Sequence, residues 1–371
     1  MYGCREHKAI ADSLPGVIGR KFGTTIRGMD ILTHAIMGAS LATAVASFRS
    51  AAEKSAPAGR RGAAALAGAV AGVLPDADAL IQSGGDALLV LDYHRHFTHA
   101  LAFVPVGALM AALLLWPFLR RRIDFATLYA CSFAAYLAHP LLDACTSYGT
   151  HLWLPFSQRR EAWNLIAVVD PLFTLLLAVP LWFALRRPGS RALRWALLLS
   201  LGYFGLSAFQ QQRAEEQVLA VAKARGHAAS QLSVKPSMAN LVLWRSLYVH
   251  DGRVQADAFH LGTAARHYPG ESAELLDTAG AQRMAANDAR RLRDIERFRI
   301  FSDGFLVQDK ARPGFVGDAR YAMQPTAIAP IWGLEWRAAG AATEFVSRHD
   351  FSPAMRRDFL AMLLGREKLN P

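Results

Sequence analysis

The chain has 371 residues, 53% of them hydrophobic, with a mean hydropathy of +0.16 and a formal net charge of +11. Its basic residues cluster in short connections between apolar runs, as is typical of membrane proteins, so we expect no nucleic-acid partner. The three cysteines have no paired spacing, which excludes a disulfide framework and a thiolate zinc site.

Residues 1–28 predict an N-terminal extension. Their apolar stretch is short and is interrupted by charged residues and a proline, which excludes a secretory signal peptide. The long apolar runs lie between this extension and the last third of the chain. We therefore predict a membrane-embedded domain over residues 29–210 and a soluble domain over residues 211–371.

Six apolar segments predict helices in the membrane domain. They cover residues 31–48, 63–75, 100–119, 125–143, 167–185 and 193–210. Several are shorter than the span of about 20 residues that a transmembrane helix needs. The second segment is the weakest, and its small residues predict a re-entrant or buried helix that packs closely against its neighbours. The sequence thus predicts a mainly α-helical, multi-pass domain of five or six helices.

Three basic connections follow the first, third and fifth segments, at residues 48–62, 120–122 and 186–194. If the chain direction alternates, they share one side of the membrane, which the positive-inside rule identifies as cytoplasmic. The remaining connections carry nearly every His and Asp of interest, and they then share the opposite face. Arg159 and Arg160 are exceptions to this charge pattern.

The soluble domain predicts a small α+β fold. A polar helix opens it, and two strand-like runs within residues 240–261 flank Asp251-Gly252, which is a good hairpin signal. Residues 284–298 predict a charged helix. Residues 299–348 predict further short strands between glycine and proline turns.

Candidate metal ligands begin in the first polar connections. His34 lies at the start of the first apolar segment, where an interfacial role is the alternative to a functional one. Asp76 and Asp78 lie in the stretch LPDAD, after a proline that ends the preceding helix. Two neighbouring carboxylates repel each other, and a divalent metal between them removes that cost. A helix cap in a solvated turn is the alternative for this pair.

The stretch HRHFTHA adds further titratable groups. His94 and His99 are expected ligands, because neutral imidazole is a common ligand of zinc. Arg95 is a candidate to bind a phosphate oxygen, or to anchor the segment at lipid headgroups. Thr98 is a candidate cap of the next helix, where it would orient His99. His96 has no assigned role.

His139 and Asp143 are four residues apart, so a helix would place them on one face. Ionisable residues inside an apolar segment favour a functional role. Pro140 predicts either a kink or the start of a new helix. Asp170, at the head of the fifth segment, is either a further ligand or a helix cap.

Together these motifs predict a metal site on one membrane face. Its expected ligands are His34, Asp76, Asp78, His94, His99, His139 and Asp143. Nitrogen and oxygen ligands without thiolates suit zinc, manganese or iron, and more than four ligands indicate two or three metals, which favours phosphoester hydrolysis. The alternatives are a transporter that uses the same residues for ion passage, and a membrane-anchored binding protein whose histidines are structural.

The motifs MDILTHAIMG, LPDAD, HRHFTHA and HPLLDACTSYGTHLWLPFS resemble, in order and spacing, the LexA-regulated, membrane-bound metal-dependent hydrolases (YdjM-like). The resemblance covers roughly residues 29–175 and marks the same seven ligands and Arg95. It implies a bacterial inner-membrane protein with a phosphoester or lipid-like substrate, by analogy with zinc-dependent phospholipases C. His96 departs from the pattern, because the family has a small residue there.

We therefore expect a membrane-bound, metal-dependent hydrolase with its site at the non-cytoplasmic face. Asp78 and Arg95 are the expected catalytic residues, with Arg95 stabilising developing negative charge. The expected cofactor is a divalent metal, with zinc ahead of manganese and iron, and the expected partner is membrane lipid. The C-terminal domain is expected in the periplasm, where it would cover the site or recognise a partner.

Overall fold

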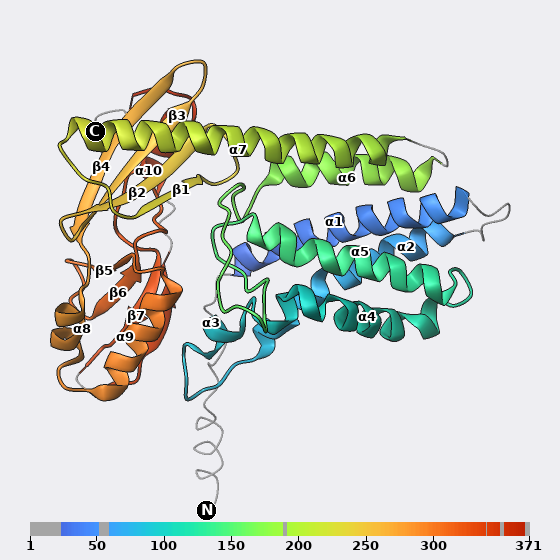
Figure 1. The fold of residues 1–371 in the computed structure, drawn as a ribbon, viewed down its shortest axis with the longest axis horizontal. Helices are drawn as coiled ribbons and strands as arrows, with labels where there is room; N and C mark the ends of the chain where they lie inside the picture. The colour runs from blue at the N-terminus through green and yellow to red at the C-terminus, as the bar shows by residue number, and fades with distance from the viewer. Residues whose placement is uncertain (1–23, 52–58, 188–190, 339, 349–351, 368–371) are drawn as a thin grey trace, which may run out of the picture.

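The computed structural model of the chain describes residues 24–51, 59–187, 191–338, 340–348 and 352–367. Most of the predicted N-terminal extension lies outside these residues. Figure 1 shows a bundle of long helices beside a β-rich part, with one helix, α7 (Ala192–Ala224), running through both. The predicted fold class is confirmed, because apolar helices long enough to span a membrane precede a small β-sheet domain.

The bundle contains long helices joined by short helical elements. The long helices are α1 (Thr24–Ala51), α2 (Arg60–Val73), α4 (Val104–Leu119), α5 (Phe125–Ala144), α6 (Pro171–Arg186) and α7. The short elements are α3 (Leu89–Tyr93) and the 3-10 helices η1 (Leu74–Leu80), η2 (Phe97–His99) and η3 (Leu101–Phe103). Within the described residues five helical stretches are long and apolar enough to cross a membrane, while α6 is shorter.

Small residues fill the contact between three helices of the bundle, and large apolar residues cover much of its exterior. The small residues are buried alanines of α1, α2 and α4 that pack together. Large apolar side chains are exposed along α4, α6 and α7, including Leu113, Trp182 and Leu198. An exposed apolar belt of this kind fits a lipid environment, in which every backbone polar group of a helix is satisfied internally.

The helix ends that flank the three basic connections lie together at one end of the bundle, on the right in Figure 1. Arg60 at the start of α2 is 3.3 Å from Asp124 and 3.0 Å from Thr127, which precede and begin α5. Arg49 near the end of α1 donates to the same threonine at 3.0 Å. The alternating chain direction expected from the sequence is therefore present.

The helix α7 is longer than its sequence predicts. The apolar segment ending at residue 210 and the polar helix after it form one continuous helix of 33 residues. Its last three turns leave the bundle and pack Ala214, Val218 and Ala222 against the first sheet. The helix ends just before Gly226, whose φ of +73° continues no right-handed helix.

In the described residues, the β-rich part holds two four-stranded antiparallel sheets. The first has the order β1 (Leu232–Pro236), β2 (Leu243–His250), β3 (Arg253–Leu261) and β4 (Ala265–Glu274). The predicted hairpin is confirmed, because Asp251 and Gly252 join β2 to β3 with φ of +46° and +68°. The helix α10 (Pro353–Leu363) packs on this sheet through Met362.

The second sheet has the order β5 (Leu306–Gln308), β6 (Phe315–Asp318), β7 (Trp332–Glu335) and β8 (Glu344–Ser347). The helices α8 (Thr278–Ala285) and α9 (Ala289–Phe301) precede it. Ile295 and Phe298 of α9 share one hydrophobic core with two leucines of the polar connection that precedes α4. Leu88 comes directly before α3, and Leu91 lies within it. This contact joins the β-rich part to the segment that carries the histidine motif.

Candidate metal centre

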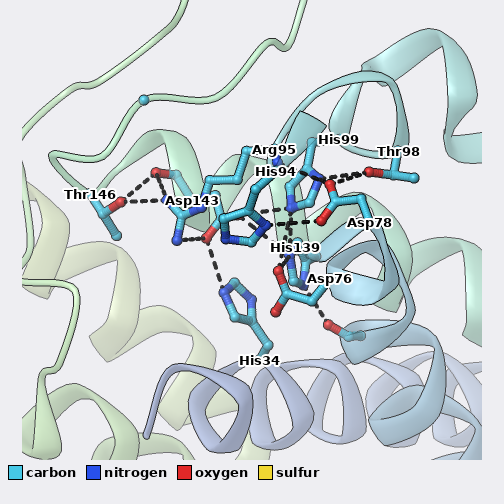
Figure 2. A network of polar contacts seen from close by, with 12 residues as sticks. His34, Asp76, Asp78, His94, Arg95, Thr98, His99, His139, Asp143 and Thr146 are labelled. Carbon is cyan, nitrogen blue, oxygen red and sulfur yellow. Dashed lines mark hydrogen bonds and ion pairs between the residues drawn. The ribbon is translucent and has the colours of Figure 1, made fainter. Parts of the chain in front are cut away.

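Two histidines and two aspartates converge at the end of the bundle that faces the β-rich part (Figures 1 and 2). Asp76 comes from η1, His99 from η2, and both His139 and Asp143 come from α5. Nε2 of His99 is 3.1 Å, and Nε2 of His139 3.4 Å, from Oδ2 of Asp143. Oδ1 of Asp76 is 3.7 Å and 3.5 Å from the same two nitrogens.

Both histidines are held through Nδ1. In His139 this atom is 2.6 Å from the backbone carbonyl oxygen of Gly72, and because a carbonyl only accepts, Nδ1 must carry the proton. In His99 it is 3.1 Å from a carboxylate oxygen of Asp78, which also accepts. A neutral imidazole then keeps a lone pair on Nε2. Oriented imidazoles of this kind are typical of metal-binding histidines.

The two Nε2 atoms are 3.0 Å apart. Two lone pairs at this distance repel each other unless a cation or a proton lies between them. Ligand atoms about 2.0–2.1 Å from a tetrahedral zinc ion would lie about 3.3 Å from one another. Five of the six separations among the four ligand atoms lie between 3.0 and 3.7 Å. The cluster therefore fits a small divalent metal ion.

Asp78 is buried behind this cluster and accepts several hydrogen bonds. They come from Nδ1 of His94 at 2.9 Å, the backbone N–H of Arg95 at 2.9 Å and the hydroxyl of Thr98 at 2.6 Å. Asp78 and His94 also form a second group with Asp76, whose ligand atoms all lie within 4.8 Å of one another. The ligand atoms of this second group are close enough together to hold a second cation. Its hydrogen bonds also orient residues of the first ligand group.

Arg95 is buried beside the cluster, with a φ of +63° that is unusual for a residue with a side chain. Its guanidinium is 3.0 Å from Oδ1 of Asp143 and donates to the hydroxyl of Thr146 at 3.0 Å. It also lies 4.9 Å from the centre of the Tyr148 ring. The predicted catalytic arginine thus contacts a candidate ligand, so its charge offsets that of the carboxylate.

His34 approaches the cluster from α1. Its Nε2 is 3.1 Å from Oδ1 of Asp143, and its ring stacks on that of His139 with the centroids 3.8 Å apart. It is a member of neither group of converging ligand atoms. All seven predicted ligands are therefore close together, with His34 on the α1 side of Asp143 and Asp78 behind His99.

Thr98 does not cap the following helix, so that prediction is wrong. The helix α4 begins at Val104 and has no side-chain cap. Thr98 is too far before the start of α4 to cap it, and its hydroxyl instead donates to Asp78, whose ionised carboxylate is a strong acceptor. It is also 3.0 Å from Nδ1 of His99, so it still orients this residue.

Two further alternatives are resolved by the helix geometry. Asp170 is the N-cap of α6, where it accepts from the backbone N–H of Phe173 and from the hydroxyl of Tyr203. It is not a member of either ligand group within the described residues. The helix α5 continues through Pro140, so His139 and Asp143 share one helical face as their spacing predicted.

Access to the cluster is narrow. The side chains of His99, His139 and Asp143 are at most 1% exposed. Among the predicted ligands, His94 is 24% and Asp76 15% exposed at the side chain. The site is therefore open to solvent on the side of these two residues, of which Asp76 belongs to both ligand groups and His94 to the second alone.

Several contributors to the site were not predicted. The carbonyl of Gly72 is a backbone group, and the sequence contains no signal for it. Tyr148 packs on Arg95 and on Phe301 of α9, where the ring centroids are 5.2 Å apart. Burial raises the pKa of Tyr148 to about 12, so its hydroxyl stays protonated at neutral pH. Its position in the stretch TSYGTH, close to the His139 motif, was the only available signal.

One protein family matches the helical part of the chain. The family model described as YdjM inner membrane protein matches residues 29–214. The uncharacterized protein YfhP of Bacillus subtilis (strain 168) is 29% identical over 192 residues, which cover 51% of this chain and 57% of the relative. The chain therefore spans little more than half the length of this relative. No solved structure matches the chain.

Proposed function

The chain belongs to the YdjM inner membrane protein family, and we propose that it is a membrane-bound, metal-dependent hydrolase that acts on a phosphoester. The main support is the convergence of His99, His139, Asp76 and Asp143, in which the Nε2 atoms of the two imidazoles are 3.0 Å apart. A divalent metal bound there supplies a Lewis acid and a means of deprotonating water near neutral pH.

The surrounding residues would hold this group in position for the reaction. Asp78 and the Gly72 carbonyl fix the two imidazole rings, so that the metal would meet preformed ligands. Arg95 balances the charge of Asp143 and would place positive potential beside a phosphoryl group. His94 and Asp76, at the exposed edge of the site, would meet the substrate first.

The site is proposed to face the periplasm. It lies at the opposite end of the bundle from the basic connections, and positive charge is typical of cytoplasmic loops. The β-rich part lies at the same end as the site (Figure 1). A reporter that is active only in the periplasm, fused at the C-terminus, should be active. An inactive periplasmic fusion combined with an active cytoplasmic one would contradict this orientation.

The activity can be tested on the full chain in detergent. Zinc, manganese and iron would each be added to chelator-treated protein, followed by phosphomonoester, phosphodiester and phospholipid substrates. We expect hydrolysis by the native chain and a loss of about 100-fold or more in His99→Ala. The matched control is His250→Ala, which removes a histidine from the β2–β3 hairpin and should retain the native rate.

The alternative of a non-enzymatic metal-binding protein or transporter predicts a different result. Stoichiometric metal without hydrolysis of any ester would support that alternative and contradict the hydrolase. The confinement of the ligands to one end of the bundle favours the enzyme, since a transporter needs polar groups near the middle of the membrane.

A further inference from the structure

A cavity of about 650 Å³ lies between the helical bundle and the β-rich part. Residues from three regions line it: the histidine segment, the connection between α5 and α6, and the β-rich part. His96 and His151 belong to this lining, with ring centroids 5.1 Å apart. The backbone N–H of His151 donates to the carbonyl of Arg95 at 3.0 Å. One wall of the cavity is thus formed by the segment that builds the metal centre.

Lys235 of β1 lines this cavity and has an unusual environment. It is 8% exposed, and its Nζ has no hydrogen-bond acceptor among the described residues. Its contact is the ring of Tyr321, whose centroid is 3.3 Å away. Burial, reinforced by the charges of Arg320 and Arg245, lowers the pKa of Lys235 well below its usual range. This environment disfavours the charged form of the amine, and an anion bound beside Nζ would favour it again.

Arg160 is the second basic side chain of the cavity that has no carboxylate partner in the described part of the chain. Among the described residues its guanidinium donates to backbone carbonyls, those of Tyr148 at 3.1 Å, Gly149 at 3.2 Å and Phe301 at 3.5 Å. Burial and the charge of Arg320 lower the pKa of Arg160, although the ionisable phenol group of Tyr148 opposes the shift. The positive charge of Arg160 is therefore only partly compensated.

Most acidic groups near the cavity are already engaged with other cations. Asp92 pairs with Arg297, and Glu161 is 3.2 Å from Arg159. Asp318 pairs with Arg320 at 2.8 Å. Asp303 is the remaining lining carboxylate, and its residue is exposed. The inner part of the cavity thus has a surplus of positive charge.

We propose that this cavity is an oxyanion-binding subsite, in which Lys235 and Arg160 hold a phosphate group of the molecule processed at the metal centre. An anion there would supply the partner that both side chains lack, with lysine acting as a point charge and arginine as a planar donor. The link to the metal centre rests on the proposed hydrolase function, whereas the binding of phosphate does not. The phosphate could belong to a lipid headgroup or be free in solution.

The test is a calorimetric titration of the full chain in detergent, with a chelator present so that no phosphate binds through a metal. The two probes are inorganic phosphate and glycerol 1-phosphate, which represents a lipid headgroup. We expect the native chain to bind at least one of them and Lys235→Met to bind it at least about tenfold more weakly. Lys310→Met, the same change at an exposed site outside the cavity, should bind as the native chain does.

Tighter binding of glycerol 1-phosphate than of inorganic phosphate would identify a headgroup, and the reverse a free anion. Lys235→Arg, which keeps the charge, should restore binding, and Arg160→Gln tests the same cavity if Lys235→Met does not fold. Native affinity in both Lys235→Met and Arg160→Gln, or no binding of either probe by the native chain, would overturn the proposal. The titration measures phosphate binding without metal, so its outcome does not depend on whether the protein is a hydrolase.

Discussion

The hydroxyl of Thr98 lies outside the four converging ligands, yet it touches the carboxylate that orients one of them. It donates to Asp78 at 2.6 Å, and Asp78 in turn accepts from Nδ1 of His99. Hydrogen bonds behind a ligand fix the direction of its lone pair and raise its basicity. Thr98 should therefore control the affinity for metal without binding the metal itself.

Replacing Thr98 with valine keeps the shape of the side chain and removes this hydroxyl. We expect the affinity for zinc to fall about 10–100-fold while the protein stays folded. Competition with a chromophoric chelator measures the change. Thr174→Val is the control, because its hydroxyl bonds to Thr33 and to the Asp170 carbonyl in α6. Equal zinc affinity of Thr98→Val and the native chain would rule out this role.

At this scale the sequence predicts the residue types of the site better than their contacts. The His and Asp motifs stand out because ionisable groups are costly beside apolar segments, and the structure brings all seven together. The cap predicted at Thr98 was wrong, since the helix begins further along the chain and the carboxylate that binds the hydroxyl comes from another segment. The carbonyl of Gly72 and the amine of Lys235 could not be predicted, because their surroundings exist only after distant segments pack.

The pair of helices α1 and α2 sets the position of the site through close backbone contact. A Cβ atom on Gly68 would lie 2.2 Å from the carbonyl oxygen of Gly38 in α1. A Cβ atom on Gly72 would lie 2.7 Å from the carbonyl oxygen of His34. The helices therefore approach at a distance that only glycine allows, as is common in membrane helix pairs. This contact holds the Gly72 carbonyl against His139.

Gly68→Ala should force α1 and α2 apart and destabilise the protein by about 1–3 kcal/mol, the usual cost of overpacking. The loss of stability is measured by thermal unfolding in detergent, with size-exclusion chromatography used to monitor the folded fraction. Gly62→Ala on the same helix meets no atom within 4 Å of the added Cβ. It should be neutral or stabilise the chain by up to about 1 kcal/mol through helix propensity. Similar destabilisation by both substitutions would contradict the packing explanation.

The sequence predicts the elements well where the hydrophobic pattern and the turn chemistry agree. The hairpin at Asp251-Gly252 is an example, because both residues adopt the positive φ that such a turn requires. The length of α7 was not predicted. The length of an apolar run indicates how much of a helix lies in the membrane, but it does not indicate where the helix ends. No helix-breaking residue follows until Gly226, so the helix continues through its polar half.

At the scale of the whole molecule, an ion pair fastens the β-rich part to the connection that carries the site. Arg297 of α9 donates to both oxygens of Asp86, at 3.1 Å and 3.0 Å, and also contacts Asp92 and Asp294. Burial opposes ionisation of Asp86, but hydrogen bonds from Arg297 and from the backbone N–H of Leu88 outweigh it and lower its pKa. Ionised Asp86 therefore stabilises the junction.

The lowered pKa of Asp86 sets the sign of the pH dependence. The stabilisation is fully present above about pH 4, where the carboxyl is ionised even in an unfolded chain, and it is lost as pH falls through the lower folded pKa. Both side chains are about one-third exposed, so solvent screening limits the effect to about 1 kcal/mol or less.

Hydrogen exchange in the connection at residues 81–93 measures this junction. After correction for intrinsic rates, Arg297→Gln should raise the exchange rate of this connection at pH 7. Acidification should raise the exchange rate in the native chain, as Asp86 is protonated, and should raise it less in Arg297→Gln, which has already lost the ion pair. Arg293→Gln changes an exposed arginine on the same helix and should exchange as the native chain does. Unchanged exchange in Arg297→Gln would exclude a fastening role for the ion pair.

The metal content of the purified protein tests the central claim most directly. After metal loading and dialysis, the native chain should retain stoichiometric divalent metal by elemental analysis. Asp143→Asn should lose it, because Asp143 lies near both imidazole nitrogens. Asp170→Asn should keep it, because asparagine can still cap α6. A native chain without bound metal, or one whose metal content Asp143→Asn leaves unchanged, would contradict the metal centre.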